Sequence, residues 1–335
     1  LYNMPKISVI VPIYRVEKYI ERCVRSLFEQ TLDDIEYIFI NDCSPDNSVI
    51  ILTKLLKEYP QRRSTVQIIN FTRNQGAAEA RKVGISLASG EYVIHCDSDD
   101  WVATTMYEKL YTSAKLYAVD MVICGMYESN GMSEKVIYQD VNSDKERFLG
   151  DLICRKTTCS LCNKLIKREI VQSSQLISPE VHMLEDQLLC VQYLVLSANY
   201  IYIDQPLYYY FVNENSVCHY CSVEACLRRA REAQQNINKL LSFLEQKNLS
   251  EQYRNEIVRM KYTPRVFIWP LVLSDPSKYI HLWRNIFPEI NCDYLFCKGI
   301  PFSLKLIFYL TLLRIYPIIW KVLHRNRKNI EVSER

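Results

Sequence analysis

Three carboxylates, Asp97, Asp99 and Asp100, lie within four residues directly after a short apolar segment. That segment, Tyr92 to Cys96, is predicted to be a buried strand, so the carboxylates are expected at its end. Neighbouring carboxylates repel one another and lose solvation, and a cation, a hydrogen-bond network or a ligand must offset this cost. Oxygen ligands at this density suit Mg²⁺ or Mn²⁺, with water and phosphate oxygens completing the site. A solvated acidic loop that caps a helix beginning near Val102 is the alternative interpretation.

Four further apolar segments are spaced along the first part of the chain. They are residues 7–11, 37–40, 66–69 and 121–124. The stretches between them, such as residues 19–28, have the apolar spacing that is typical of helices. Alternating strands and helices predict an α/β fold with a mostly parallel central sheet flanked by helices. Ligands bind such sheets beyond the carboxyl ends of the strands, so the residues after each strand are candidate site residues.

The residues after the first two predicted strands could bind a nucleotide base. Pro12 ends the first strand, and Tyr14 offers a flat face on which a base could stack. Asp42 follows the second strand and could accept a hydrogen bond from a base N–H, although a turn or capping role is equally compatible with the local sequence. Arg81 lies near the start of the helix after the third strand. Because the sequence has no glycine-rich phosphate-binding motif, bound phosphates would need a metal.

Length, charge and cysteine content limit the class of protein. A chain of 335 residues can form one large α/β domain with a substantial appendage. The net charge of +3 is too small to indicate nucleic-acid binding. The first apolar segment is too short for a secretory signal, which predicts a cytoplasmic protein. Two C-x-x-C pairs, Cys159–Cys162 and Cys218–Cys221, could bind zinc, but we expect free thiols there.

Four motifs follow one another in the first third of the chain. They are Val-Ile-Val-Pro-Ile-Tyr from residue 9, Asn-Asp-Cys-Ser-Pro-Asp from residue 41, Asn-Gln-Gly-Ala-Ala-Glu-Ala-Arg from residue 74 and Asp-Ser-Asp-Asp from residue 97. Their order resembles family 2 inverting glycosyltransferases with the GT-A fold. A later segment, Cys162 to Glu169, resembles capsule and exopolysaccharide members, with Cys162 where those have Trp. The resemblance implies a GT-A catalytic domain at residues 1–220 and a helical C-terminal region at 221–335. Within the domain, the nucleotide-sugar half covers about 5–125 and the acceptor half about 126–220.

The resemblance also implies a nucleotide-diphosphate sugar donor, and UDP is the most frequent nucleotide in the family. The implied donor contacts are Pro12, Tyr14, Glu17, Asp42, Arg81, Asp97, Ser98 and Asp99. Asp97-Ser98-Asp99 is then the D-x-D motif, in which Asp99, together with Asp97, holds Mn²⁺ or Mg²⁺ at the diphosphate. His219 is a further candidate metal ligand, as a downstream histidine is in some relatives.

Glu185 and Asp186 lie in the first turn of a predicted helix, where the helix dipole favours carboxylates. From the sequence alone, this dipole effect explains both residues. In the family, however, the aspartate of this motif is the base that deprotonates the acceptor hydroxyl, so the resemblance makes Asp186 the predicted catalytic base. The implied enzyme transfers a hexosyl or N-acetylhexosaminyl group to a hydroxyl of a growing glycan or glycolipid.

Residues 300–323 form an apolar segment that basic residues follow. The basic residues are Lys321, His324, Arg325, Arg327 and Lys328. Charged residues and Pro317 interrupt the segment, which argues against a membrane-spanning helix. Such a segment can instead lie on the anionic inner leaflet of the cytoplasmic membrane as a peripheral anchor. Packing on the catalytic domain, or on a second copy in a homodimer, is the alternative.

Two other functions are alternatives to a glycosyltransferase. A phosphatase-like hydrolase would use Asp97 as its nucleophile, but Asp100-Trp101 stands where such enzymes normally have a Gly-Thr type of continuation. A catalytically silent scaffold would keep the fold and bind partners through its C-terminal helices. The intact Asp97, Asp99 and Asp186 favour an enzyme.

Overall fold

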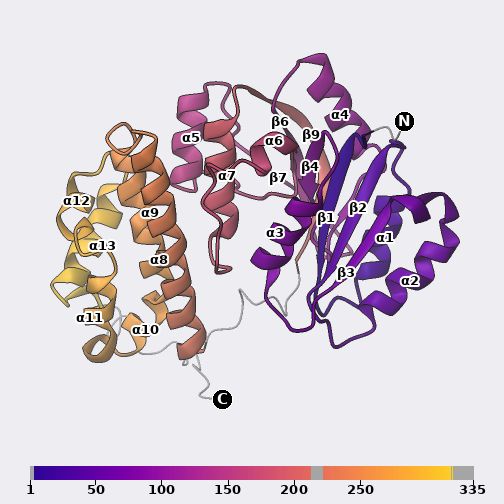
Figure 1. The fold of residues 1–335 in the computed structure, drawn as a ribbon. Coiled ribbons are helices and arrows are strands. Elements are labelled where there is room, and N and C mark those ends of the chain that lie inside the picture. Colours follow the sequence, from indigo (N-terminus) through magenta and orange to yellow (C-terminus); the bar gives the residue numbers. More distant parts are fainter. Residues whose placement is uncertain (1–3, 213–221, 318, 320–335) are drawn as a thin grey trace. The chain divides into compact units, whose positions relative to one another are not determined.

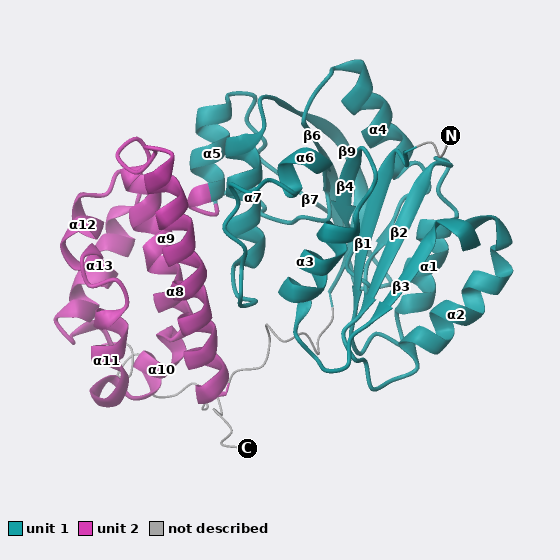
Figure 2. Ribbon diagram, in the orientation of Figure 1, with its two compact units in different colours: residues 1–152, 156–213 teal, residues 153–155, 214–335 magenta. Residues whose placement is uncertain are grey.

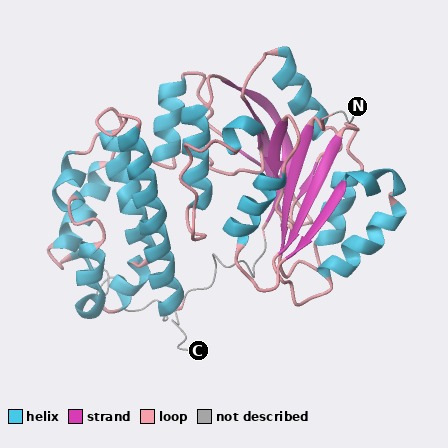
Figure 3. Cartoon of the chain, viewed as in Figure 1, coloured by secondary structure: helices cyan, strands magenta, loops and turns pink. Residues whose placement is uncertain are grey.

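The computed structural model describes residues 4–212, 222–317 and 319. The chain divides into unit 1, residues 1–152 and 156–213, and unit 2, residues 153–155 and 214–335 (Figure 2). Unit 1 contains the strands, and unit 2 is helical (Figure 3). The predicted domain boundary after residue 220 lies outside the described residues.

A single sheet runs through the described part of unit 1, in the order β3-β2-β1-β4-β8-β6-β9-β5, with β7 beside β6 (Figure 1). The strands are β1 (Ile7–Ile13), β2 (Ile35–Asn41), β3 (Val66–Asn70), β4 (Tyr92–His95), β5 (Trp101–Val102), β6 (Met121–Ser129), β7 (Glu134–Ile137), β8 (Lys164–Lys167) and β9 (Tyr200–Phe211). From β3 to β4 all pairs are parallel, whereas β8 runs antiparallel to β4 and β6. The predicted α/β class is confirmed, and all five predicted strands form.

Helices cover both faces of this sheet. In unit 1 they are α1 (Ile20–Phe28), α2 (Ser48–Glu58), α3 (Ala77–Leu87), α4 (Met106–Leu116), α5 (Lys145–Ile153), α6 (Arg168–Val171) and α7 (Glu185–Leu196), with a 3₁₀ helix η1 (Pro60–Thr65). Val9 and Val11 of β1 join a core with residues of α1, α2 and α4. Ile10 points to the other face, because side chains alternate along a strand, and there it contacts Gly84 of α3. The helix expected near Val102 begins later, as α4, because Val102 pairs with β9.

The parallel register brings four loops to one edge of the sheet. Ile13, at the end of β1, lies beside Asn41 of β2, and Asn41 lies beside Asn70 of β3. On the other side of β1, Ile10 pairs with His95 of β4. The loops that follow these strands therefore start next to one another, as expected for a ligand site in an open parallel sheet.

Unit 2 has a core of its own, built by helices. They are α8 (Val223–Gln246), α9 (Arg254–Phe267), α10 (Trp269–Ser274), α11 (Pro276–Asn285), α12 (Ile290–Phe296) and α13 (Phe302–Leu312). The Arg265 guanidinium is buried, 4.6 Å from the Trp283 ring centroid, and donates to the main-chain oxygens of Ile286 and Phe287. The prediction of a helical C-terminal region is confirmed. None of the described helices combines the length and apolar content needed to cross a bilayer.

The end of α1 is held by Arg62 of η1. This buried guanidinium donates to the main-chain oxygens of Phe28, Gln30 and Asp33 at 2.9–3.1 Å. A helix leaves its last carbonyls without intrahelical partners, and this side chain satisfies the Phe28 carbonyl at the end of α1 and the Gln30 carbonyl just beyond it.

We expect Arg62→Met to lower the free energy of unfolding by about 3 kcal/mol, because buried hydrogen bonds from a charged group contribute about 1.5–3 kcal/mol each. Urea unfolding followed by circular dichroism measures the change. Arg63→Met in the same η1 is the matched control, since Arg63 is exposed, and it should leave stability within about 0.5 kcal/mol of wild type. Equal effects of the two substitutions would contradict the capping role.

Candidate active site

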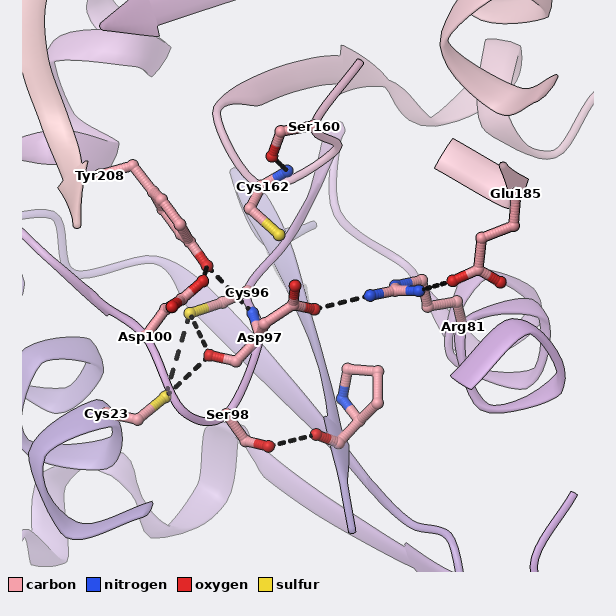
Figure 4. Close-up of polar contacts among 11 residues, drawn as sticks. Cys23, Arg81, Cys96, Asp97, Ser98, Asp100, Ser160, Cys162, Glu185 and Tyr208 are labelled. Carbon is pink, nitrogen blue, oxygen red and sulfur yellow. Dashed lines mark hydrogen bonds and ion pairs between the residues drawn. The ribbon is translucent and has the colours of Figure 1, made fainter. Parts of the chain in front are cut away.

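The acidic loop, residues 97–100, follows β4 and is anchored by its last carboxylate (Figure 4). Asp100 is 1% exposed and accepts hydrogen bonds from the Tyr208 hydroxyl at 2.5 Å and the Phe211 amide at 2.7 Å, both on β9. The Tyr208 hydroxyl also accepts from the Asp97 amide at 3.2 Å. Burial, followed by the charges of Asp97 and Asp99, raises the pKa of Asp100. Asp100 therefore fixes the loop to β9.

Arg81 joins the acidic loop to the start of α7. Its Nη2 donates to Asp97 Oδ1 at 2.6 Å, and its Nη1 pairs with the Glu185 carboxylate (Figure 4). Burial raises the pKa of Glu185 to about 7, although Arg81 acts in the opposite direction. The arginine thus links carboxylates that are far apart in the sequence and that would each be costly to bury alone.

Asp99 is the carboxylate of the loop that lacks such a partner. None of the described side chains donates a hydrogen bond to it, while Arg22 of α1 binds its main-chain oxygen at 3.0 Å. Burial, followed by the charge of Asp97, raises the pKa of Asp99 to about 6. A bound cation would relieve this destabilisation of the ionised form.

The carboxylates of Asp97 and Asp99 match the type of ligand that binds a divalent metal beside a phosphate. Mg²⁺ is commonly held by one or two carboxylates together with substrate phosphates, and Asp97 and Asp99 are two such carboxylates. No cluster of three or more His, Cys, Asp or Glu side chains that could hold a metal exists among the described residues. A metal held by these two carboxylates would need phosphate oxygens and water to complete its coordination. The further candidate ligand, His219, lies outside the described residues.

Asp42, the predicted base-binding residue, is buried and holds the loop before α3. Its carboxylate accepts from the amides of Gln75 at 2.6 Å and Gly76 at 2.8 Å. Gly76 has a φ of 89°, and the His182 imidazole occupies the space that a side chain there would need. Asp42 thus anchors the distant loop before α3, which has no side-chain cap, and the contact of Asp42 with a base stays a prediction.

The loop after β1 is fastened to the loop after β2. Glu17 accepts from the Asn47 amide at 3.1 Å, and its own amide donates to Asp46 at 3.0 Å. Tyr14 is 39% exposed, as a ring that stacks on a ligand must be. The Pro12 carbonyl accepts from the Ser98 hydroxyl at 2.7 Å, which ties this loop to the acidic loop (Figure 4).

Asp186, the predicted base, lies in the first turn of α7 as expected. It is half-buried, and its Oδ1 accepts from the Gln187 amide at 2.8 Å. The structure joins its neighbour Glu185 to the acidic loop through Arg81. Sequence reasoning missed this link, because its only local signal was an acidic first turn that a dipole effect explains equally well.

One cysteine of the two C-x-x-C pairs lies beside the acidic loop (Figure 4). Cys159 and Cys162 are both buried, and Cys162 lies beside Asp97 in Figure 4. Burial raises the pKa of the Cys162 thiol, which keeps it protonated and unreactive. Cys218 and Cys221 lie outside the described residues.

Comparison with known proteins identifies the family. Residues 8–174 match the model of glycosyl transferase family 2. EpsH of Bacillus subtilis is 29% identical over 262 residues, which is 76% of this chain and 73% of EpsH. Glycosyltransferase GlyG of Streptococcus pneumoniae is 30% identical over 231 residues, 63% of this chain and 72% of GlyG.

A solved structure shares the fold. The crystal structure of S. aureus TarS residues 1–349 in complex with UDP-GlcNAc superposes with a TM-score of 0.57 at 18% identity, covering 96% of this chain and 92% of that one. The order of the four motifs, the sheet topology and these matches all indicate the same family and fold. The chain therefore belongs to glycosyl transferase family 2, and it is a glycosyltransferase with the GT-A fold.

Proposed function

We propose that the chain transfers a sugar from a UDP-sugar, with inversion, to a hydroxyl of a growing, lipid-linked surface polysaccharide. One observation carries this proposal: the acidic loop is joined to the predicted nucleotide loop through Ser98 and Pro12, and to the start of α7 through Asp97, Arg81 and Glu185. Residues predicted for donor binding and for base catalysis thus belong to one connected network. The UDP-GlcNAc bound to TarS, which shares the fold, supports the choice of donor.

On the donor side, Tyr14 stacks on the base and Asp42 contacts its N–H edge, with Glu17 holding the loop that carries Tyr14. Asp97 and Asp99 would hold Mn²⁺ or Mg²⁺, which when bound supplies Lewis-acid stabilisation of the leaving diphosphate. Arg81 holds the Asp97 carboxylate in place and reduces the repulsion between the two aspartates.

On the acceptor side, Asp186 takes the proton of the attacking hydroxyl. Inversion requires a base on the face of the sugar opposite the leaving diphosphate, and the start of α7 lies across Arg81 from the acidic loop (Figure 4). Glu185 cannot readily fill this role, because the residue is buried and its carboxylate is engaged with Arg81. We assign Glu185 to holding Arg81 and Asp186 to proton transfer.

We further propose that the protein works at the cytoplasmic face of the membrane. Along α13 and its C-cap residue, four apolar side chains recur at helical spacing and are 44–80% exposed: Phe302, Leu306, Tyr309 and Leu313. The basic residues 321–328 follow in the sequence, but lie outside the described residues. An apolar stripe next to basic residues suits an anionic lipid surface, where each Lys or Arg contributes about 1 kcal/mol.

Asp99→Ala should abolish Mn²⁺-dependent UDP binding in calorimetry while raising the melting temperature of the ligand-free protein at pH 7. The sign follows from the pKa: the folded value of about 6 lies above the ordinary 3.8, so ionisation of Asp99 opposes folding as pH rises through this range. The increase in melting temperature should vanish near pH 3.5, where Asp99 is mostly protonated in both the folded and the unfolded protein. Asp100→Ala is the contrast, because it removes an acceptor for two buried donors and should lower the melting temperature. Unchanged UDP binding by Asp99→Ala would refute its role.

Asp186→Asn should lower the rate of sugar transfer by roughly 10²–10⁴, the usual contribution of general-base catalysis, with donor affinity unchanged. Release of UDP from UDP-GlcNAc and other UDP-sugars, with and without a lipid-linked glycan extract, measures transfer, and calorimetry measures donor affinity. Exposed Asp204 provides the control substitution, Asp204→Asn, which should transfer at the wild-type rate. A Glu185→Gln enzyme that loses transfer while Asp186→Asn keeps it would place the base one residue upstream.

Phe302→Ser combined with Leu306→Ser should reduce sedimentation with vesicles of phosphatidylcholine and phosphatidylglycerol at every salt concentration. Replacing Arg325, Arg327 and Lys328 with Gln should reduce it mainly at low salt, because surface charge is screened over about 8 Å at physiological ionic strength. Phe308→Ser is not a suitable control, since Phe308 is buried in unit 2. Wild-type binding by both variants, or a dimer that the double substitution dissociates, would assign the stripe to protein packing.

A further inference from the structure

Arg22 of α1 contacts the acidic loop independently of Arg81. Its Nη2 donates to the main-chain oxygen of Asp99 at 3.0 Å. The neighbouring Cys23 lies across the loop from Arg81 in Figure 4, and its thiol is 3.8 Å from the Asp97 oxygen. Two guanidinium groups from different helices therefore hold a loop that carries three carboxylates, one through a side chain and one through the backbone.

The Arg22 guanidinium is held in place by aromatic rings. It lies 3.7 Å from the ring centroid of Trp101 and 4.6 Å from that of Phe211. Trp101 stacks in turn on Tyr209, with centroids 5.1 Å apart and planes 10° apart, and Tyr209 stacks on Tyr127 at 4.9 Å. These three rings are direct cross-strand partners on β5, β9 and β6. Such cross-strand aromatic pairs stabilise a sheet and provide a rigid support.

The described contacts of Arg22 include no ion pair with a carboxylate. Burial lowers the pKa of Arg22, whereas the charges of Asp100, Cys23 and Asp99 act in the opposite direction. Its Nε is buried and has no hydrogen-bond partner among the described residues. Because its described contacts are two rings and a carbonyl, no carboxylate neutralises it directly, and its field acts on the acidic loop.

One side of the Arg22 side chain borders a pocket instead of packing against other side chains. A pocket of about 440 Å³ opens beside it, lined also by Trp101, Ser129, Ser133 and Glu134. A side chain that borders a pocket can be shortened without leaving a closed cavity, so packing alone does not account for its precise support. This favours a role in the chemistry of the acidic loop over a role in stability.

We propose that Arg22 is a positioning residue for Asp99. It fixes the Asp99 peptide through the carbonyl hydrogen bond, which limits the Asp99 carboxylate to orientations that can bind the metal. This proposal rests on the proposed function. Residues that orient a metal ligand without touching the metal commonly change metal affinity by 10–100-fold when they are replaced.

The test measures Mn²⁺ affinity directly. Free Mn²⁺ is followed by electron paramagnetic resonance as the ion is titrated into protein saturated with UDP. Arg22→Met keeps the length of the side chain but removes its charge and donor, and it should raise the Mn²⁺ dissociation constant roughly 10–100-fold. Arg22→Lys should recover part of the loss. Trp101→Ala should reproduce the Arg22→Met effect, and Trp101→Phe should be milder, because it keeps a ring under the guanidinium.

Two controls separate positioning from other roles. Arg25→Met, one turn along α1, removes an arginine that pairs with Glu21 and Glu58 and should leave Mn²⁺ affinity unchanged. UDP affinity is also measured in EDTA, where Arg22→Met should match wild type. An equal loss of UDP affinity with and without Mn²⁺ would mean that Arg22 touches the nucleotide, and it would overturn the proposal.

The remaining outcomes distinguish this proposal from the proposed function. If wild type binds Mn²⁺ with UDP, and Asp99→Ala does not, an Arg22→Met protein with wild-type Mn²⁺ affinity overturns the positioning role alone. If wild type itself binds no Mn²⁺ in the presence of UDP, both the metal-dependent donor site and the positioning role fall. A large drop in the melting temperature of ligand-free Arg22→Met would assign the residue to stability instead.

Discussion

Repulsion among the three carboxylates after β4 is the constraint on which the site depends. The structure offsets the three charges in different ways. Asp100 is buried with a hydroxyl and an amide donor, and its pKa is raised. Asp97 pairs with Arg81. No described side chain donates to the Asp99 carboxylate, Arg22 binds its main-chain oxygen, and burial raises the pKa of Asp99 to about 6. The charge that the protein leaves without a partner is the one best suited to bind a cation.

These offsets also explain how distant segments are brought to one place. Tyr208 lies on β9, Arg81 on α3 and Glu185 on α7, and each reaches the acidic loop or a residue bound to it. The loop therefore connects the parallel half of the sheet with the mixed half that contains β9. In a transferase the donor and the acceptor must meet, and a shared polar network at the junction keeps their binding residues in a fixed relation.

Unit 2 illustrates a different use of an arginine. Arg265 is fully buried, stacks on Trp283 and donates to main-chain oxygens, so it satisfies acceptors within a helical core. The same unit leaves Phe302 and Leu313 of the α13 stripe more than half exposed. Burying such side chains is worth about 25 cal/mol for each Å² removed from water, which favours a surface partner for the stripe.

The sequence by itself determined the class of fold, the five main strands and the family. Continuous apolar segments that end at Pro12, Asp42 or Asp97 specify buried strands with polar ends, and this signal is local. The strands β5, β7 and β8 had no such signal, because two to four residues show no periodicity. Only the tertiary structure decided the contacts of Glu185 with Arg81, of Asp100 with Tyr208, and of Arg22 with Trp101. The two residues of these pairs are 104, 108 and 79 positions apart in the sequence, respectively. Which side chains meet depends on how the sheet and the helices pack, and no local sequence pattern encodes this packing.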